Sequence, residues 1–429
     1  MKIAIIGAGF TGLSAAFELI KKGHQVFVFE KDKAPGGLAI GYRKDKWQWS
    51  LEKHYHHWFT NDNSVLELAK EINYEVIIKR PKTAVFVKNK IYQLDSPLTV
   101  LKFPLLSFFE RIRMSMVIGF LKYDPFWKSL EGYKASIILP KLMGEKPYKM
   151  IWEPLFVNKF GKFADNISLA WFWARIKKRT PFLAYPKKGF LNFANHLVKV
   201  IEQKGGSVYF NTEILELSSK DKPQIKFGEI ARPAGWRIEN YDAVIVTTPS
   251  FLFLKIAPQL PNNYKEKLGK LKSLGATNLV LRLNKPFFND NTYWLSVCDK
   301  DAPIMAIVEH TNFMDKNNYN NEHLVYLGNY KSLNDPYFLM TKEEMLKKFD
   351  PYLKRINKDY YKNIIGFELF KAPFAQPIIP INYSKILPSF ITPFKNVFLA
   401  NIEQVYPWDR GTNYAVELGQ KVAKLLGDK

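Results

Sequence analysis

Three glycines and one acid near the start of the chain have the spacing of a site that binds phosphate. Gly7, Gly9 and Gly12 form G-x-G-x-x-G directly after an apolar run, Lys2–Ile6, and Glu30 ends a second apolar run. In such a motif the first glycine permits a tight turn and the second lets the backbone approach a pyrophosphate. The third allows the helix to pack closely on the strand. The chemistry that these residues predict is dinucleotide binding.

The same stretch indicates the elements that must position these residues. Lys2–Ile6 is typical of a buried parallel strand, residues 13 to 20 carry apolar side chains at helical spacing, and Val26–Phe29 predicts a second strand. The N-terminus of the helix would offer free N–H groups to the phosphates. Glu30, at the tip of the second strand, can accept hydrogen bonds from both hydroxyls of an adenosine ribose and would repel a 2′-phosphate, which disfavours NADP. The alternative is a glycine-rich turn without a ligand.

A second pair of glycines follows the acid, in the sequence Lys31-Asp32-Lys33-Ala34-Pro35-Gly36-Gly37-Leu38. An acid followed by paired glycines resembles the FAD-binding amino terminus of the amine oxidase, phytoene desaturase and protoporphyrinogen oxidase superfamily. In that superfamily the pair passes close to the flavin. Many members carry Arg immediately after the pair, whereas this chain has Leu38. Taken alone, the pair could also be an ordinary loop.

The end of the chain resembles the second FAD motif of the same superfamily. Asn396–Ala400 predicts a last strand and Asn413–Leu426 a helix. In the family this strand ends in Ala-Gly-Asp and the helix points at the flavin ring, but here Asn401 and Ile402 replace the glycine and the aspartate. The resemblance implies that Glu403 or Asp409 supplies the missing carboxylate. The alternative is a strand and a closing helix without a cofactor.

Two inner segments fit the same architecture. Gly205–Leu217 predicts a strand, a turn and a second strand, where the resemblance implies a backbone contact of Ile214 with the adenine. Tyr241–Pro249 predicts a buried strand behind the cofactor. The complete set of FAD contacts that the resemblance implies is Gly7, Ala8, Gly9, Phe10, Thr11, Gly12, Glu30, Lys31, Gly36, Gly37, Leu38, Ile214, Glu403, Asp409, Gly411, Thr412 and Asn413.

These motifs predict an α/β protein with a Rossmann-like FAD-binding domain of the glutathione-reductase type. The domain is discontinuous because its motifs come from both ends and the middle of the chain. We expect it to comprise residues 1–80, 190–252 and 390–429, with an inserted α+β substrate domain made of 81–189 and 253–389. A chain of 429 residues, 47% of them hydrophobic, can bury the cores of two such domains.

Composition limits the other classes of function. The formal net charge is +23, which attracts anions, but no nucleic-acid-binding module is apparent. The single cysteine, Cys298, excludes an internal disulfide and a cysteine-rich zinc site, and we expect no metal. No apolar stretch is long enough to cross a bilayer, and no signal peptide precedes the first strand, so we expect a cytoplasmic protein. The apolar and basic stretch Leu101–Tyr123 could instead lie on an anionic membrane surface, or be an ordinary helix.

Aromatic and titratable residues in the middle of the chain are candidates for the reaction itself. Trp171, Trp173 and Tyr185 lie in segments that resemble the superfamily's substrate domain and could form a wall of an apolar cavity, or be plain core. The candidate catalytic residues are His56, His57 and Lys188, of which the histidines follow the FAD loop and could accept a proton.

The sequence therefore predicts an FAD-dependent oxidoreductase. We expect it to dehydrogenate an apolar or amphipathic small molecule, with hydride passing to flavin N5 and with oxygen or a quinone as the final acceptor. No second G-x-G-x-x-G unit is present to bind a nicotinamide. Two alternatives remain open: a flavin enzyme without net redox chemistry, such as a sugar-nucleotide mutase, and an FAD protein of a membrane surface without turnover.

Overall fold

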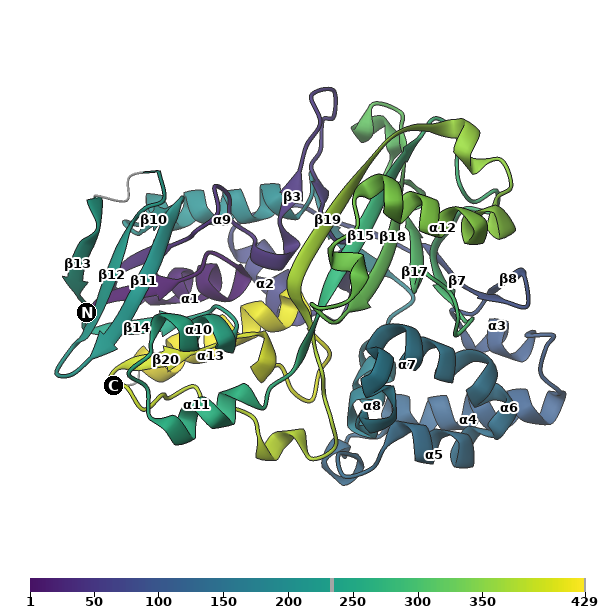
Figure 1. Ribbon diagram of the computed structural model, residues 1–429, viewed down its shortest axis with the longest axis horizontal. Coiled ribbons are helices and arrows are strands. Elements are labelled where there is room, and N and C mark those ends of the chain that lie inside the picture. The colour runs from purple at the N-terminus through teal and green to yellow at the C-terminus, as the bar shows by residue number, and fades with distance from the viewer. Residues whose placement is uncertain (232–234, 428–429) are drawn as a thin grey trace.

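A parallel sheet lies at one end of the molecule in the computed structural model, which describes residues 1–231 and 235–427 (Figure 1). Its five strands run in the order β10 (Ser207–Tyr209), β2 (Gln25–Phe29), β1 (Lys2–Ile6), β14 (Ala243–Val246) and β20 (Val397–Leu399). The strands come from the start, the middle and the end of the chain. A single sheet thus joins segments that are almost 400 residues apart.

The central strand of this sheet is apolar on both faces because both faces are covered. Ile3 and Ile5 pack into one core with a layer of helices, whereas Ala4 and Ile6 pack into another. The helical layer contains α1 (Phe10–Lys21), α2 (Asn63–Glu71), α9 (Phe190–Gln203) and α13 (Thr412–Gly427). The other face carries the antiparallel sheet of β11 (Thr212–Ser219), β12 (Pro223–Glu229) and β13 (Arg237–Asn240), together with α10 (Ser250–Ile256) and α11 (Asn262–Gly269).

Helices from the two ends of the chain touch closely. A Cβ added at Gly419 of α13 would lie 2.4 Å from the carbonyl oxygen of Thr11 in α1, so only glycine fits at this crossing. Ser14 Oγ also donates to the carbonyl of Val416 over 3.0 Å. This contact holds the N-termini of α1 and α13 in one layer.

A second sheet forms the upper right of Figure 1. Its seven strands run in the order β19 (Ile364–Pro377), β15 (Ser273–Leu283), β18 (His323–Lys331), β17 (Ala306–Glu309), β16 (Thr292–Val297), β7 (Lys82–Val87) and β8 (Lys90–Gln93). All neighbours are antiparallel except β16 and β7. Helix α12 (Lys342–Ile356) packs on one face through Met345, Phe349 and Leu353.

The lower right of Figure 1 is a group of helices between β8 and the return to the first sheet. It contains α3 (Pro97–Leu101), α4 (Phe108–Tyr123), α5 (Ala135–Met143), α6 (Glu145–Pro147), α7 (Glu153–Phe160) and α8 (Leu169–Lys178). Local sequence sets the starts of α3 and α4, because Ser96 and Ser107 each form a capping box with the residue three positions on.

The elements predicted from the sequence agree with this architecture. The first strand is confirmed at Lys2–Ile6, the last strand is shorter than predicted, and the C-terminal helix is longer by one residue at each end. Every strand of the five-stranded sheet lies in a range predicted for FAD binding. A three-stranded sheet pairs β9 (Leu183–Pro186) with β5 (Trp58–Phe59) and β6 (Val76–Lys79). A last small pair is β3 (Gly41–Tyr42) with β4 (Leu51–Glu52).

Candidate functional site

The first glycine motif forms a tight turn between β1 and α1. Gly7 has φ +107°, and a Cβ there would lie 2.7 Å from Thr247 Oγ1. A Cβ on Gly12 would lie only 2.0 Å from the carbonyl oxygen of Gly7, so this glycine lets the helix pack on the strand. Gly9 is the N-cap of α1, and no side chain among the described residues caps this helix. The N–H groups of its first turn therefore remain available to an anion.

Glu30 lies beside this turn. Its Oε2 accepts from the Ala8 N–H over 2.7 Å and its Oε1 accepts from the Asp32 N–H over 2.9 Å. Burial raises the pKa of Glu30, and the two N–H donors oppose that rise. The segment after β10 runs alongside, because the Glu30 carbonyl accepts from the Thr212 N–H over 2.9 Å. This is the arrangement expected for a ribose-binding acid, with the start of β11 and its buried Ile214 on the same side.

The paired glycines pack directly on the first motif. The Gly36 N–H donates to the Ala8 carbonyl over 3.0 Å, and a Cβ on Gly37 would lie 3.2 Å from the Cα of Gly9. Both glycines have positive φ, +119° and +56°. Two motifs about 25 residues apart in the chain therefore form one surface of bare backbone, which a pyrophosphate can approach. Leu38 is partly exposed beside them, and Lys31 pairs with Glu213 over 2.8 Å.

The two candidate carboxylates of the C-terminal motif have different surroundings. Glu403 is buried, and its Oε2 accepts from both the N–H and the hydroxyl of Ser250 at the start of α10. Asn401 donates to the same hydroxyl over 3.1 Å. Burial raises the pKa of Glu403. The structure thus ties Glu403 to the end of β14, while Asp409 lies among cations described below.

The N-terminus of α13 is the second helix start in this region. Its Thr412 Oγ1 accepts from Trp58 Nε1 over 2.5 Å, and Asn413 Oδ1 accepts from the Val65 N–H over 3.1 Å. Because these side chains hold neighbouring elements, it is the backbone of Gly411, Thr412 and Asn413 that is left to contact a ligand. The helix dipole would favour negative charge at this point.

These residues fit FAD. The backbone at Gly9 and Gly37 keeps accessible surface and is the cradle that a pyrophosphate needs, and Glu30 lies where the adenosine ribose would follow. Thr248 Oγ1, at the end of β14 and next to Gly7, is buried and has no hydrogen-bond partner among the described residues. A bound phosphate or water would satisfy this hydroxyl.

The helices α3 to α8 form what we call the helical insertion. Asp409 connects this insertion to the segment that leads into α13. It accepts from Arg175 Nη1 over 2.7 Å and Trp171 Nε1 over 3.2 Å, and Lys159 Nζ lies 3.3 Å away. These cations, with Arg410, hold the pKa of the Asp409 carboxyl far below its usual range against the effect of burial. Lys159 Nζ and Arg175 Cζ each lie 5.0 Å from the centre of the Trp171 ring.

Arg410 points from the same segment to the second sheet. Its Nε donates to Gln376 Oε1 over 2.8 Å and its Nη2 donates to the hydroxyl of Tyr330. Burial opposes the charge of Arg410, but the neighbouring Tyr330 and Asp409 raise its pKa. Burial and the nearby Arg175 lower the pKa of Lys159.

The histidine segment faces this cationic group. Arg410 lies close enough to disfavour protonation of His54 and His56, and Arg179 does the same for His57. Burial is the larger cause and lowers the pKa of His56 to about 4 and that of His57 to about 3, so both are neutral at pH 7. His56 Nδ1 lies 2.6 Å from the His54 carbonyl and must therefore carry the proton. Its Nε2 is left as a proton acceptor.

Arg179 completes the group. Its side chain is exposed, although desolvation by the surrounding protein lowers its pKa to about 9. His56 and His57 are half-buried. A ligand could thus reach these side chains. Among the described residues, Asp409 is the one carboxylate within contact of the cations Lys159, Arg175 and Arg410.

The structure separates the other predicted site residues. Trp173 is buried, donates to the Asp124 carbonyl over 2.8 Å and stacks on Trp408, on the side of α8 toward α4. Tyr185 is fully buried, and its hydroxyl donates to the carboxylate of Glu52. Lys188 has φ +67° and an exposed side chain. Of the predicted substrate residues, the structure brings only Trp171 to the cationic group.

Sequence reasoning missed Arg410, Arg175, Arg179, Lys159 and Tyr330. They lie on four separate segments, and no motif links them. Asp409 and Arg410 come just before Gly411, a predicted FAD contact, and this nearness was a usable signal for these two residues alone.

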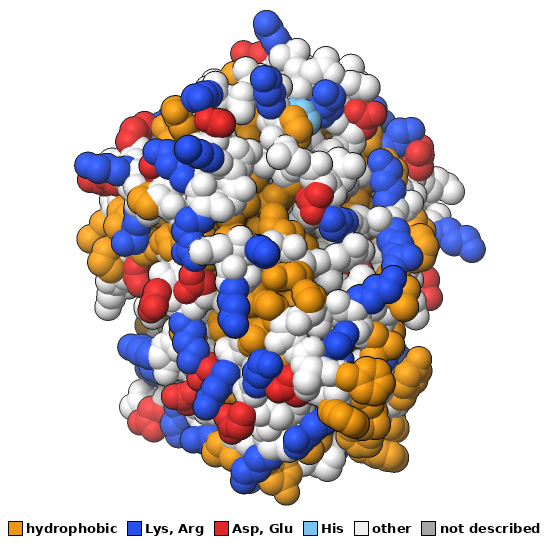
Figure 2. All heavy atoms as spheres, turned by 90° about the vertical axis from the view of Figure 1, so that its right-hand side faces the viewer, with side chains coloured by type: hydrophobic (Ala, Val, Ile, Leu, Met, Phe, Trp, Pro, Cys, Tyr) orange, Lys and Arg blue, Asp and Glu red, His pale blue; other side chains and the backbone are white. Residues whose placement is uncertain are grey.

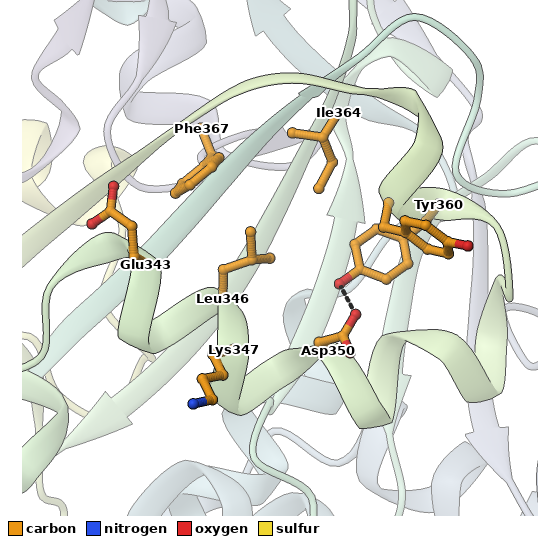
Figure 3. A pocket seen from close by; sticks show the side chains of 8 residues that line it. Glu343, Leu346, Lys347, Asp350, Tyr360, Ile364 and Phe367 are labelled. Carbon is orange, nitrogen blue, oxygen red and sulfur yellow. Dashed lines mark hydrogen bonds between the residues drawn. The ribbon is translucent and has the colours of Figure 1, made fainter.

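A functional site could also be a surface depression, a metal site or a membrane span. Figure 3 shows a shallow depression between α12 and the start of β19, lined by Leu346, Phe367 and their neighbours, in which Tyr360 donates to Asp350 over 2.9 Å. Lys347 points away from it. Within the described ranges, no three His, Cys, Asp or Glu side chains are grouped to hold a metal ion. In the same residues, no helix has the length and apolar character needed to cross a membrane.

Comparison with known proteins places this chain in a family. A model of flavin-containing amine oxidoreductases matches residues 10–425. The chain belongs to that family. FAD is therefore its cofactor, and the resemblance to the amine oxidase superfamily is confirmed. The family's members are flavin-dependent oxidoreductases, which is the class predicted from the sequence.

Two curated relatives show how far the sequence likeness extends. The chain is 23% identical over 329 residues to an L-amino-acid oxidase of Sistrurus catenatus edwardsii, and this match covers 71% of this chain and 62% of the oxidase. It is 53% identical over 45 residues to a 4,4′-diapophytoene desaturase of Staphylococcus haemolyticus, which covers 10% of this chain and 9% of the desaturase. The chain thus spans less than two thirds of the oxidase it matches.

Two solved structures share the fold. An Exiguobacterium protein provisionally assigned as a protoporphyrinogen oxidase superposes with a TM-score of 0.75 at 14% identity, covering 99% of this chain and 98% of its own. A reduced UDP-galactopyranose mutase superposes with a TM-score of 0.77 at 13% identity, covering 100% of this chain and 96% of its own. The predicted fold class is confirmed by this agreement over the whole chain.

Proposed function

We propose that this protein uses FAD to dehydrogenate an amphipathic small molecule whose polar end is anionic. The observation that supports the anionic end is the group of Lys159, Arg175, Arg179 and Arg410, which faces the histidine segment and has Asp409 as its nearby counter-charge. Surplus positive charge in a desolvated place favours a carboxylate or phosphate and repels an ammonium ion. An amine substrate is for this reason disfavoured.

Each part of the site has a role in this proposal. Bound FAD would supply a ring that accepts a hydride from a substrate C–H. Gly9, Gly37 and Glu30 would hold its pyrophosphate and ribose. The cationic group would orient the substrate, and the buried aromatic Trp171 would exclude water from it. His56, neutral with a free Nε2, is the candidate proton acceptor. Oxygen or a quinone is the proposed final electron acceptor.

The test is anaerobic bleaching of the flavin. The purified protein is mixed with neutral isoprenoids, porphyrinogens with carboxylate side chains, amines and amino acids, and the flavin absorbance is followed. The proposal expects bleaching by an anionic amphipathic compound. Arg179→Gln should raise the concentration needed for half-maximal bleaching by roughly tenfold, the loss of one charged contact, with Arg80→Gln on the exposed surface as the matched control. Equal bleaching of both variants would contradict the assignment of Arg179.

A second candidate is a flavin enzyme without net redox chemistry, which the likeness to the mutase structure favours. Such an enzyme also needs positive charge, in its case for the diphosphate of a nucleotide sugar. It would require chemical reduction of the flavin before turnover and would not be bleached by its own substrate. If no compound bleaches the flavin and the reduced protein turns over nothing, the third hypothesis, an FAD protein without turnover, is supported instead.

We also propose that the protein is located in the cytoplasm, in line with its single, unpaired Cys298.

A further inference from the structure

Helix α4 is apolar on both of its faces, but only one of them is covered. Met114 and Leu121 point into the helical insertion and are buried. Phe109, Met116 and Phe120 lie on the opposite side and are 82%, 63% and 62% exposed. A surface helix of a protein in water is expected to be polar on its outer face. The sequence of α4 is thus that of a helix with a second apolar neighbour.

The exposed residues form one continuous surface. Phe109, Met116, Phe120 and Tyr123 recur at i, i+7, i+11 and i+14, so they share one side of the helix. Arg111 donates to the Leu101 carbonyl at the end of α3 over 2.5 Å, so exposed Leu101 lies near α4. We call these residues, with exposed Leu142 near the end of α5, the α4 surface.

Two arginines fix the neighbouring helices to α4. Besides Arg111, Arg113 donates from Nη2 to the Lys141 carbonyl over 2.6 Å and from Nε to the Leu142 carbonyl over 2.7 Å, at the C-terminus of α5. The surface is therefore built on a rigid set of three helices. Figure 2 shows a broad cluster of hydrophobic side chains at the lower right, in the half of the molecule where Figure 1 places α3 to α6, with Lys and Arg side chains beside it.

The charges around this surface have one predominant sign. Between residues 97 and 150 the chain has nine Lys and Arg against four Asp and Glu. Two of those acids are paired, Glu110 with Lys146 over 3.3 Å and Glu145 with Lys149 over 3.0 Å. Lys102, Arg113 and Lys141 are exposed beside the apolar residues. Lys122, which belongs to the stretch Leu101–Tyr123, turns inward and donates to the carbonyls of Lys177 and Arg179.

We propose that the α4 surface docks on an anionic lipid bilayer, with Phe109, Phe120 and Tyr123 inserted at the headgroup boundary. Exposed aromatic and aliphatic residues edged by Lys and Arg are the chemistry that this boundary binds. A second copy of this chain would bring two such basic surfaces together, and the net charge of +23 opposes that association. An anionic bilayer satisfies both the apolar residues and the bases.

Docking here would also present the site to lipid-soluble compounds. Lys177 Nζ donates to the carbonyls of Tyr123 and Asp124, so the end of α4 is bound to the end of α8. Helix α8 carries Arg175 and leads to Arg179 in the candidate site. The membrane-facing helix and the substrate-facing cations are thus neighbours in one packed unit.

The test is sedimentation of the FAD-loaded protein with vesicles. We expect binding to vesicles of phosphatidylcholine and phosphatidylglycerol, weaker binding to phosphatidylcholine alone, and release by added NaCl. Phe109→Ser with Phe120→Ser should weaken binding by roughly tenfold or more, because two inserted rings are lost. The matched control is Leu339→Ser, which changes an 86% exposed residue beside α12, the helix on the seven-stranded sheet and away from α4. Flavin absorbance and melting temperature check that each variant is folded.

Charge variants separate the electrostatic part. Lys102→Glu with Lys141→Glu should weaken binding to the anionic vesicles by roughly tenfold. The same change at Lys347 and Lys358, which are exposed in and just after α12, should not weaken it. Failure of the wild type to bind anionic vesicles at low salt would overturn the proposal. So would equal binding by all variants. A wild-type dimer in light scattering that Phe109→Ser with Phe120→Ser converts to a monomer would assign the surface to a second copy instead.

Discussion

The glycines of the first motif have two different roles, which single substitutions can separate. Gly12 is required by the fold, since a Cβ there would overlap the Gly7 carbonyl at 2.0 Å. Gly9 is not, because its φ of −72° suits any residue and a Cβ would meet only the Cα of Gly37, at 3.8 Å. The bare backbone at Gly9 is left for the ligand.

We therefore expect Gly9→Ala to fold normally and to lose FAD. The added methyl group would occupy the place of the pyrophosphate, so affinity for FAD should fall at least tenfold, while the melting temperature of the FAD-free protein stays unchanged. Gly12→Ala should instead lower that melting temperature. Visible spectra and FAD titrations of the two variants check this. Full retention of FAD by Gly9→Ala would refute the assignment of this turn.

Glu52 is a buried carboxyl that the proposed reaction does not use. It accepts from the Tyr185 hydroxyl over 2.8 Å and from the Phe190 N–H over 2.9 Å, but burial still raises its pKa from 4.5 to about 7. The folded protein thus holds a proton that the unfolded chain releases between pH 4.5 and about 7. Stability is lost as pH rises through this window, by up to about 3 kcal/mol.

Glu52→Gln should remove this loss. The variant and the wild type should unfold at similar urea concentrations at pH 4.5, and the variant should become the more stable one at pH 8. Glu239 provides a control of opposite sign, because its hydrogen bond with Lys2 lowers its pKa. Glu239→Gln should be the less stable protein at pH 8 and equal to the wild type at low pH. A constant difference between Glu52→Gln and the wild type from pH 4.5 to 8 would contradict the pKa shift.

At the scale of elements, local patterns in the sequence predicted what local interactions determine. The strand Lys2–Ile6 and helix α13 follow from periodicity, and the surroundings of Gly7, Gly9 and Gly12 follow from one motif. The cationic group could not be predicted in this way. Lys159, Arg175 and Arg410 are brought together only when α7 and α8 pack against the segment before α13, a contact that spans more than 200 residues.

Tyr185 is a residue that local sequence placed at the substrate site, whereas the structure places it in the core. Its sequence context resembles a substrate-facing turn, but its hydroxyl is used by Glu52 in the core. Whether an aromatic residue faces a cavity or a buried acid depends on a partner more than 130 residues away, which no local pattern contains. The aromatic residue that does reach the cations, Trp171, differs from Trp173 only by its position around α8.

Asp409 is the element-scale contact that we expect to be most sensitive. Asp409→Asn would leave Arg175 and Lys159 desolvated without their shared counter-charge, which typically costs about 3 kcal/mol or more. The free energy of unfolding in urea should fall by this amount. Asp359→Asn removes an exposed ion pair with Lys362 and should change it little. If both variants unfold like the wild type, Asp409 does not anchor the helical insertion.

At the scale of the whole molecule, FAD should hold the two ends of the chain together because it contacts both. Strands β1 and β20 flank β14 in one sheet, and the first turns of α1 and α13 both face the proposed cofactor. A ligand that contacts both ends binds the folded protein alone. It should therefore raise the melting temperature in proportion to the logarithm of its concentration above the Kd.

The two halves of the cofactor allow this to be tested. FAD at about 100 times its Kd should add about 2.7 kcal/mol to the stability of the FAD-free protein. FMN lacks the adenosine half that Glu30 and the segment before β11 are placed to bind, so it should raise the melting temperature far less at the same concentration. Glu30→Ala should bring the effect of FAD down toward that of FMN, because the acid beside the Ala8 N–H is then lost. Equal stabilisation by FMN and FAD would mean that the flavin end alone binds, and that the first strand, turn and acid serve only the fold.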